Sequence, residues 1–307
     1  MTQMDKPLCG FLNVLKPPGM SSAHVVGAVR RMLGGAKVGH AGTLDPEASG
    51  VLPIMVGKAA RLFDYMQDKE KAYVTEVAFG CATDTQDAQG AAVAVAVGEN
   101  YPDEAAVLAA LPAFTGVIMQ TPPMYSAIKQ DGKRLYQLAR DGKEADIPAR
   151  EVTVHSLDFR GMTENHGALL SVRCSKGFYV RTLCQDLGDQ LGCPAHMRFL
   201  LRTQSGPFTL ATAHTLEALR EAADNGTLAD KLLPPEAALG HLPMTNVPRG
   251  LEKAVRNGGH LPWARFKALH DSPAAEGMPF GVWMDGALCA IAQRHDDLVK
   301  VRSWLAD

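Results

Sequence analysis

The chain has 307 residues, of which 46% are hydrophobic and 21% charged, and its formal net charge is −2. This composition can supply a core and excludes a chain that is disordered throughout, and the length predicts one large domain or a large domain with a small one. No apolar run approaches the roughly 18 residues that a membrane-spanning helix needs, so we expect no membrane span. Residues 1–7 lack the apolar stretch of a signal peptide, which predicts a cytoplasmic protein.

The cysteines are widely separated and form no CxxC pair. We therefore expect free buried thiols in a reducing compartment, without a disulfide framework or a metal site. They are Cys9, Cys81, Cys174, Cys184, Cys193 and Cys289.

The first 66 residues predict two short buried strands, each followed by a helix. The strands are expected at 11–15 and 50–57, and the second helix at 58–66. Ser21 or Ser22 can cap the first helix, and Gly34-Gly35 can end it. The apolar face of that helix consists of Val25, Val26, Val29, Met32 and Leu33.

Strands and helices then alternate irregularly between residues 72 and 223. Because regular βαβ spacing is missing, this order predicts an α+β fold with a mixed, largely antiparallel sheet flanked by helices. The expected strands are 72–80, 91–97, 151–159, 168–175 and 197–203, and the expected helices are 103–111, 132–141, 180–190 and 215–223.

The character of the sequence changes near residue 240. Pro234-Pro235, Pro243 and Pro248 predict a linker there. Beyond it, short apolar runs predict a small β-rich domain, and Asp285-Gly286 between two of these runs is a hairpin signal.

Positive charge is concentrated in three segments. No acidic residue occurs between Lys6 and Leu44, and residues 121–150 and 173–202 are also rich in Lys and Arg. If these segments meet in space, they form a face suited to a phosphate backbone. Ordinary solvated surfaces explain the same pattern equally well.

Several motifs fail in this sequence. A phosphate-binding loop at Gly57-Lys58 would need Gly in place of Leu52 and Ser or Thr in place of Ala59. The acidic spacing in 84–90 does not fit a calcium loop, and the histidines show no HxxxH or HxH spacing. A GxSxG nucleophile elbow is also missing. We expect no metal site.

The segment 39–50 is different, because it is a turn-rich stretch (GHAGTLDPEASG) between two apolar strands. Its glycines leave the backbone uncrowded, and Pro46 restricts the chain directly after Asp45. Such a loop can present one aspartate from a rigid frame. An isolated Asp before Pro is otherwise a turn or cap residue.

This segment resembles the catalytic loop of the TruB-type tRNA pseudouridine synthases, and further blocks of the family follow in the family's order. The blocks are 16–22 (KPPGMSS), 71–73 (KAY), 80–90 (GCATDTQDAQG), 122–129 (PPMYSAIK), 175–182 (SKGFYVRT) and 200–202 (LLR). The resemblance implies a pseudouridine synthase catalytic domain over 1–240, in which 121–150 forms a thumb-like RNA-binding insertion. It also implies a PUA-like RNA-binding domain over 245–307.

The family's reaction isomerises uridine 55 in the T loop of tRNA, without a cofactor. By resemblance, Asp45 is the nucleophile, Arg181 is the cation that holds it ionised, and Tyr73 stacks on the flipped base and assists proton removal from C5. Taken alone, Tyr73 would be a core aromatic and Arg181 a phosphate contact or a surface residue. Whether Asp45 attacks C1′, adds to C6 or removes a proton from C2′ stays open.

The same resemblance assigns five residues to substrate binding. His40 fills the space that the flipped nucleotide leaves, and Tyr179 and Leu200 line the pocket. Lys16 and Arg202 are expected as backbone or scaffold contacts. On their own, these would be turn and packing residues.

The expected partner is tRNA, bound by a monomer. Two other functions compete with this prediction. A non-catalytic tRNA-binding or tRNA-folding module would not need Asp45, Tyr73 and Arg181 together. A hydrolase with an aspartate nucleophile needs a second acid, a base or a metal, and none is evident near Asp45.

Overall fold

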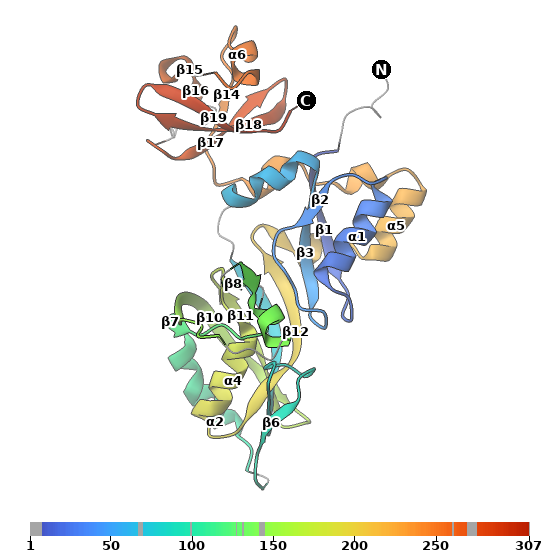
Figure 1. Cartoon of the computed structure of the whole chain (residues 1–307), viewed down its shortest axis with the longest axis vertical. Helices are drawn as coiled ribbons and strands as arrows, with labels where there is room; N and C mark the ends of the chain where they lie inside the picture. Colours follow the sequence, from blue (N-terminus) through green and yellow to red (C-terminus); the bar gives the residue numbers. More distant parts are fainter. Residues whose placement is uncertain are drawn as a thin grey trace.

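A mixed sheet forms the centre of the larger part of the molecule (Figure 1). The computed structural model describes residues 8–66, 70–98, 100–126, 128–130, 132–140, 145–259, 261–268 and 275–306. The nine-stranded sheet has the order β1-β3-β12-β4-β11-β10-β7, with β2 on β3 and β13 on β12. Its strands are β1 (Gly10–Lys16), β2 (Val38–His40), β3 (Ser49–Val56), β4 (Lys71–Phe79), β7 (Gly116–Gln120), β10 (Arg150–Thr163), β11 (Gly167–Cys174), β12 (Ala195–Ser205) and β13 (Phe208–Thr209).

One parallel pair, β3 with β12, interrupts an otherwise antiparallel sheet. The predicted mixed, largely antiparallel sheet is thereby confirmed. The pair places Gly50 beside Arg202 so closely that a β-carbon on Gly50 would lie 2.2 Å from the Arg202 carbonyl oxygen. Only glycine fits here, and Gly50 also has a φ of +113°, which disfavours other residues. The strand that carries Arg202 therefore lies directly against the end of the 39–50 segment.

Helices α1 to α5 belong to the larger part of the molecule, and α6 belongs to the C-terminal part. They are α1 (Ser22–Met32), α2 (Glu104–Ala110), α3 (Leu135–Arg140), α4 (Val180–Gln190), α5 (Leu216–Asp224) and α6 (Glu252–Arg256). The 3₁₀ turns are η2 (Gly57–Tyr65), η3 (Leu111–Phe114), η4 (Leu210–Thr212), η5 (Leu228–Lys231), η6 (Pro235–Ala238) and η7 (Trp263–Arg265). Two small hairpins complete this part, β5 (Cys81–Thr83) with β6 (Ala92–Val95) and β8 (Lys129–Gln130) with β9 (Lys133–Arg134).

The first helix begins and ends where its local signals predict. Ser21 is the N-cap, and its hydroxyl accepts a hydrogen bond from the backbone N–H of His24 at 3.2 Å. The chain leaves the helix at Leu33, and Gly34 follows with a φ of +62°. Val25 and Val29 are fully buried in the main core. Arg30, Arg31 and Lys37 of the first basic segment are exposed.

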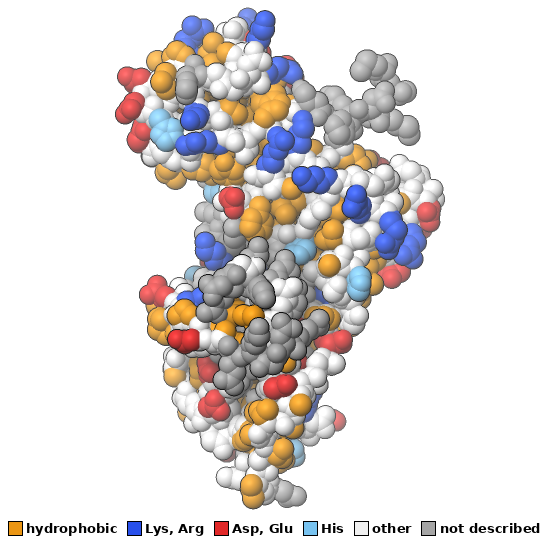
Figure 2. All heavy atoms as spheres, in the orientation of Figure 1, with side chains coloured by type: hydrophobic (Ala, Val, Ile, Leu, Met, Phe, Trp, Pro, Cys, Tyr) orange, Lys and Arg blue, Asp and Glu red, His pale blue; other side chains and the backbone are white. Residues whose placement is uncertain are grey.

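The C-terminal part forms a six-stranded sheet of its own. Its strands are β14 (Met244–Asn246), β15 (Leu261–Pro262), β16 (Lys267–Ala268), β17 (Pro279–Met284), β18 (Ala287–His295) and β19 (Leu298–Trp304). The predicted hairpin is confirmed, because Asp285 and Gly286 both have positive φ and connect β17 to β18. Figure 2 shows Lys and Arg side chains gathered over this sheet and over the side of the molecule that carries α1.

The predicted linker near residue 240 is instead packed into an apolar cluster that joins the two sheets. Leu239 is fully buried, and Leu242 and Met244 are buried with it. Leu288 and Leu305 of the C-terminal part belong to the same cluster. Proline and glycine mark the change of direction here, but the leucines between them are too apolar to stay in water.

Three smaller expectations changed. The predicted helix at 58–66 is a 3₁₀ turn, the strand Gly116–Gln120 was not predicted, and the helix predicted at 132–141 begins at Leu135 and is described up to Arg140, with residue 141 outside the described residues. All cysteines are free, as expected, and Cys174, Cys184, Cys193 and Cys289 are buried. No helix among the described residues is long and apolar enough to cross a membrane.

Candidate active site

A cavity of about 250 Å³ opens beside the loop that connects β2 to β3. The chain thus brings together residues that the sequence assigned to one site from four separate segments. The predicted residues that line the cavity are Asp45, Tyr73, Tyr179, Arg181 and Leu200. His40 lies half-buried at the end of β2, outside this lining.

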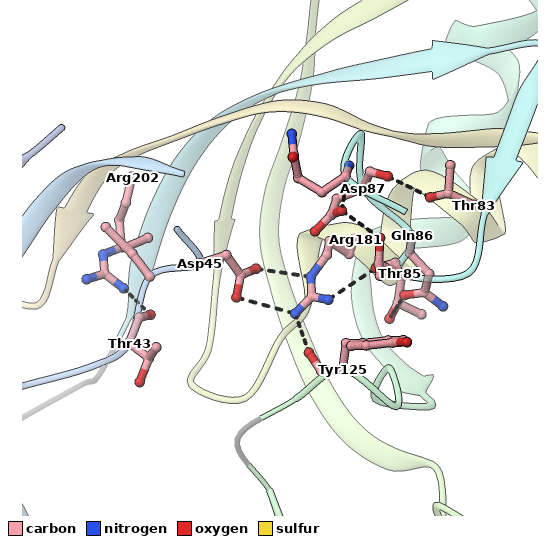
Figure 3. A network of polar contacts seen from close by, with 12 residues as sticks. Thr43, Asp45, Thr83, Thr85, Gln86, Asp87, Tyr125, Arg181 and Arg202 are labelled. Carbon is pink, nitrogen blue, oxygen red and sulfur yellow. Dashed lines mark hydrogen bonds and ion pairs between the residues drawn. The ribbon is translucent and has the colours of Figure 1, made fainter. Parts of the chain in front are cut away.

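Arg181 is the centre of the polar contacts in the cavity (Figure 3). It is the second residue of α4, and only 6% of its side chain is exposed. Its Nε lies 3.0 Å from Asp45 Oδ2, and its Nη2 lies 3.5 Å from Asp45 Oδ1. The remaining donors reach the carbonyl oxygens of Thr85 at 3.1 Å and Tyr125 at 2.9 Å. The planar guanidinium thereby fixes the carboxylate against two further loops.

Asp45 keeps one edge open to the cavity, since 37% of its side chain is exposed. Desolvation by the surrounding protein raises the pKa of this carboxyl, and the Arg181 guanidinium opposes that effect. A group that enters the cavity can therefore reach the carboxylate, while the opposite edge is held by Arg181.

Tyr73 lies in β4 and is buried beside Arg202, its partner in the register of β4 and β12. Burial raises the pKa of the phenol well above its ordinary value, and the nearby Arg202, which hydrogen-bonds to it, acts in the opposite direction. The phenol is therefore neutral at physiological pH.

Lys16 and Arg202 are fully buried and hold the loop from behind. Lys16 Nζ donates to the carbonyl oxygens of Pro17 at 2.8 Å and Pro46 at 2.7 Å. Burial lowers the pKa of this amine to about 8.

Arg202 donates to three backbone carbonyls, those of Gly42 at 3.1 Å, Thr43 at 3.2 Å and Val51 at 2.7 Å. Both residues were assigned to the substrate or to the scaffold. Their burial and their carbonyl partners support the scaffold.

Ser22 is a third support of this loop, a role that was not predicted for it. Its hydroxyl donates to the Leu44 carbonyl and accepts from the Leu44 N–H, both at 2.9 Å. Ser21 and Ser22 looked alike as helix caps. Ser21 caps the helix, while Ser22 fixes the residue directly before Asp45.

Gln120 is a second residue that the sequence did not single out. It ends β7 with 3% exposure, and its side-chain amide clamps the backbone of Tyr179. Gln120 Nε2 donates to the Tyr179 carbonyl at 3.0 Å, and the Tyr179 N–H donates to Gln120 Oε1 at 2.7 Å. A polar residue between an apolar run and Pro122-Pro123 was the only local signal for it.

The segment 84–90, which failed as a calcium loop, uses its carboxylates to shape itself. Asp87 Oδ1 accepts from the Thr85 hydroxyl at 2.6 Å, and Asp84 Oδ1 accepts from the Ala91 N–H at 2.8 Å. Gln86 adopts a φ of +62° within this turn. The turn delivers the Thr85 carbonyl to Arg181.

Solved structures share this fold over the whole chain. A chain of an H/ACA ribonucleoprotein bound to a substrate RNA with 2′-deoxyuridine matches with a TM-score of 0.74 and 24% identity, covering 100% of this chain and 92% of that one. A chain of a Cbf5-Nop10-Gar1 complex matches with a TM-score of 0.73 and 25% identity, covering 100% and 91%.

The family comparison is more specific. The model of the TruB family pseudouridylate synthase N-terminal domain matches residues 30–180, and that of the tRNA pseudouridylate synthase B C-terminal domain matches residues 181–240. These matches place the chain in the class of pseudouridylate synthases.

Curated relatives agree, and each is called tRNA pseudouridine synthase B. The protein of Geobacillus thermodenitrificans is 45% identical, covering 86% of this chain and 89% of its own. That of Symbiobacterium thermophilum is 52% identical over 78% of each chain, and that of Halalkalibacterium halodurans is 41% identical over 98% of each. The chain belongs to the TruB family of pseudouridylate synthases.

Proposed function

We propose that this chain is a tRNA pseudouridine synthase that isomerises uridine 55 of the T loop, with Asp45 as nucleophile. The observation that carries the proposal is the Asp45–Arg181 ion pair, in which one carboxylate edge stays open to a cavity of about 250 Å³. Drug-sized ligands occupy pockets of about 300–1,000 Å³, so this cavity suits a single nucleobase. The names of the relatives supply tRNA as the substrate.

The reaction requires no redox step. The bond between N1 and C1′ breaks, the base turns, a bond forms between C5 and C1′, the C5 proton leaves and N1 gains a proton. Asp45 provides the charged oxygen for the covalent or proton-transfer step, and Arg181 holds it in place. The base must first leave the T loop, at a cost of a few kcal/mol, and enter the cavity.

Tyr73, Tyr179 and Leu200 form the walls that receive the base in this proposal. Tyr73 stacks on it, and its phenol oxygen assists removal of the C5 proton. Because burial keeps the phenol neutral, it can take that proton only if it gives up its own at the same time. His40 fills the space that the uridine leaves in the RNA.

The division of labour along the chain is also part of the proposal. Residues 1–240 carry the chemistry, with 121–150 as the thumb that closes over RNA, and residues 245–307 form a PUA-like RNA-binding domain. Within the thumb, residues 127, 131 and 141–144 lie outside the described residues. The enzyme acts as a cytoplasmic monomer.

The test uses tRNA transcripts that carry tritium at C5 of uridine. The proposal is supported if one tritium is released per tRNA and if this release disappears when cytidine replaces uridine 55. Binding of tRNA without release supports the non-catalytic folding module instead. Release from a uridine at another position would refute the assignment to uridine 55.

A further inference from the structure

Arg150 lies at the rim of the cavity, outside the residues that the sequence assigned to the site. It is the first residue of β10, opposite Gln120 of β7. Its guanidinium carbon lies over the Tyr179 ring, 5.2 Å from the centroid. A β-carbon built on Gly177 would lie 3.7 Å from the same guanidinium carbon. Arg150 therefore packs against two residues that line the cavity.

The Arg150 side chain has no acceptor in the described part of the chain. Its Nε is buried and has no hydrogen-bond partner there. The described residues also offer no carboxylate within ion-pair distance of it. Arg173 on β11 and Arg198 on β12 of the same sheet instead pair with glutamates at 3.1 and 2.7 Å. A half-buried cation without an acceptor is costly, which suggests that an anion completes this site.

The other two guanidinium groups near the cavity, those of Arg181 and Arg202, already donate to protein acceptors. Arg181 directs its donors at Asp45, Thr85 and Tyr125, and Arg202 is fully buried against backbone carbonyls. Among the described residues, Arg150 is the guanidinium at this rim that retains donors for a ligand.

We propose that Arg150 binds a phosphodiester of the RNA next to the uridine that enters the cavity. This inference rests on the proposed function, because a flipped nucleotide brings its two flanking phosphates to the rim. Arginine suits this role, since its planar fork matches two phosphate oxygens. The Tyr179 ring and Gly177 restrict the Arg150 guanidinium before RNA binds, so less side-chain freedom is lost on binding.

The experiment measures tRNA binding against salt concentration for wild type, Arg150→Met and Arg150→Lys. Each phosphate neutralised contributes roughly 0.7–0.9 to the log–log slope, so Arg150→Met should lose about that much while Arg150→Lys retains it. At fixed salt, loss of a charge-assisted contact should weaken binding by about tenfold or more in the Met variant. KM should rise by more than kcat falls.

Arg160→Met is the matched control. Arg160 lies on the same strand, is exposed and donates to the Ser171 hydroxyl at 2.7 Å, away from the cavity. The Arg160→Met substitution removes the same charge, and it should leave the salt dependence of tRNA binding, KM and kcat as in wild type. An unchanged slope in Arg150→Met, with weaker binding, would show that Arg150 only braces Tyr179.

A second measurement covers the case in which Arg150→Met folds poorly. Two RNA stem-loops are compared with the unmodified RNA, one with a methylphosphonate on the 5′ side of the target uridine and one with it on the 3′ side. One of the two should bind the wild-type protein more weakly than the unmodified RNA does. Arg150→Lys should lose less from that substitution. Equal losses at both positions in both proteins would overturn the proposal. Tritium release by wild type is measured separately, so a failure of the proposed function is recognised on its own.

Discussion

The two sides of the cavity differ in how their charges are satisfied. Residues 42–46, which we call the floor, carry Asp45 and are held by the buried side chains of Lys16, Ser22 and Arg202. Residues 177–181, which we call the wall, carry Arg181 and are held by the amide of Gln120.

The contacts by which Lys16, Ser22 and Arg202 support the floor end on protein carbonyl or N–H groups. The wall also packs against a guanidinium, Arg150, that finds no acceptor among the described residues. The floor is built to keep one carboxylate still, whereas the wall leaves binding capacity for a ligand. The Asp45–Arg181 pair is the contact that joins the two.

The largest effect is expected from removing the Asp45–Arg181 ion pair. Asp45→Asn keeps the shape of the side chain and removes its charge, so tritium release should fall to the level without enzyme while tRNA binding persists. Arg181→Met should also abolish turnover, because it removes the cation that orients Asp45. Substantial release by the Asn variant would exclude Asp45 as nucleophile.

Tyr73→Phe should have the next largest effect on turnover. Phe retains the stacking surface and loses the hydroxyl, so kcat should fall by about a hundredfold or more, the range of general acid–base catalysis, with a modest change in affinity. Single-turnover kinetics and tRNA binding measure the two parts. If Phe is as active as wild type while Ala is inactive, stacking alone explains the residue.

Arg202→Met tests the floor. The change leaves the carbonyls of Gly42, Thr43 and Val51 without their donor, so the free energy of unfolding should fall by about 3 kcal/mol, measured in urea. The kcat should fall as well, because Asp45 loses its frame. Arg160→Met removes an exposed arginine and serves as the control. A stable, fully active Arg202→Met enzyme would contradict the scaffold role.

Gln120→Met tests the support of the wall. The near-isosteric side chain removes both hydrogen bonds to Tyr179, so the free energy of unfolding should fall by about 1–3 kcal/mol. KM should rise as Tyr179 loses its position, and Gln120→Glu should restore part of the loss, because its carboxylate still accepts from the Tyr179 N–H. Equal KM values in wild type and both variants would mean that Gln120 serves stability alone.

The smallest effect concerns pH. Desolvation raises the pKa of Asp45, so this carboxyl becomes protonated at a higher pH than an ordinary aspartate, for which the value is about 3.9. Since the ionised form is required, kcat/KM should decline on acidification, with a midpoint above that value. Measured tRNA binding over the same range controls for effects on the RNA. A flat kcat/KM down to about pH 4 would rule the shift out.

Local signals predicted much of the fold. Helix α4 begins and ends at the predicted residues, and α1 has the predicted cap and stop. Strand β7 was missed, because a short edge strand between a 3₁₀ turn and two prolines has little local signature. The packed segment near residue 240 was misjudged because proline content says where a chain turns and not what its leucines touch.

By itself, the sequence determined the family, through ordered motifs, and it singled out five of the residues that line the cavity, namely Asp45, Tyr73, Tyr179, Arg181 and Leu200. Only the tertiary structure decided how these residues are held. Gln120 and Tyr179 are 59 positions apart, and Arg202 and Gly42 are 160 apart, so no local pattern encodes either contact. Such pairs form because the register of the sheet brings distant strands together and leaves buried polar groups that must find partners. The parallel pairing of β3 with β12 places Arg202 behind Asp45, and the pairing of β7 with β10 places Gln120 and Arg150 beside Tyr179.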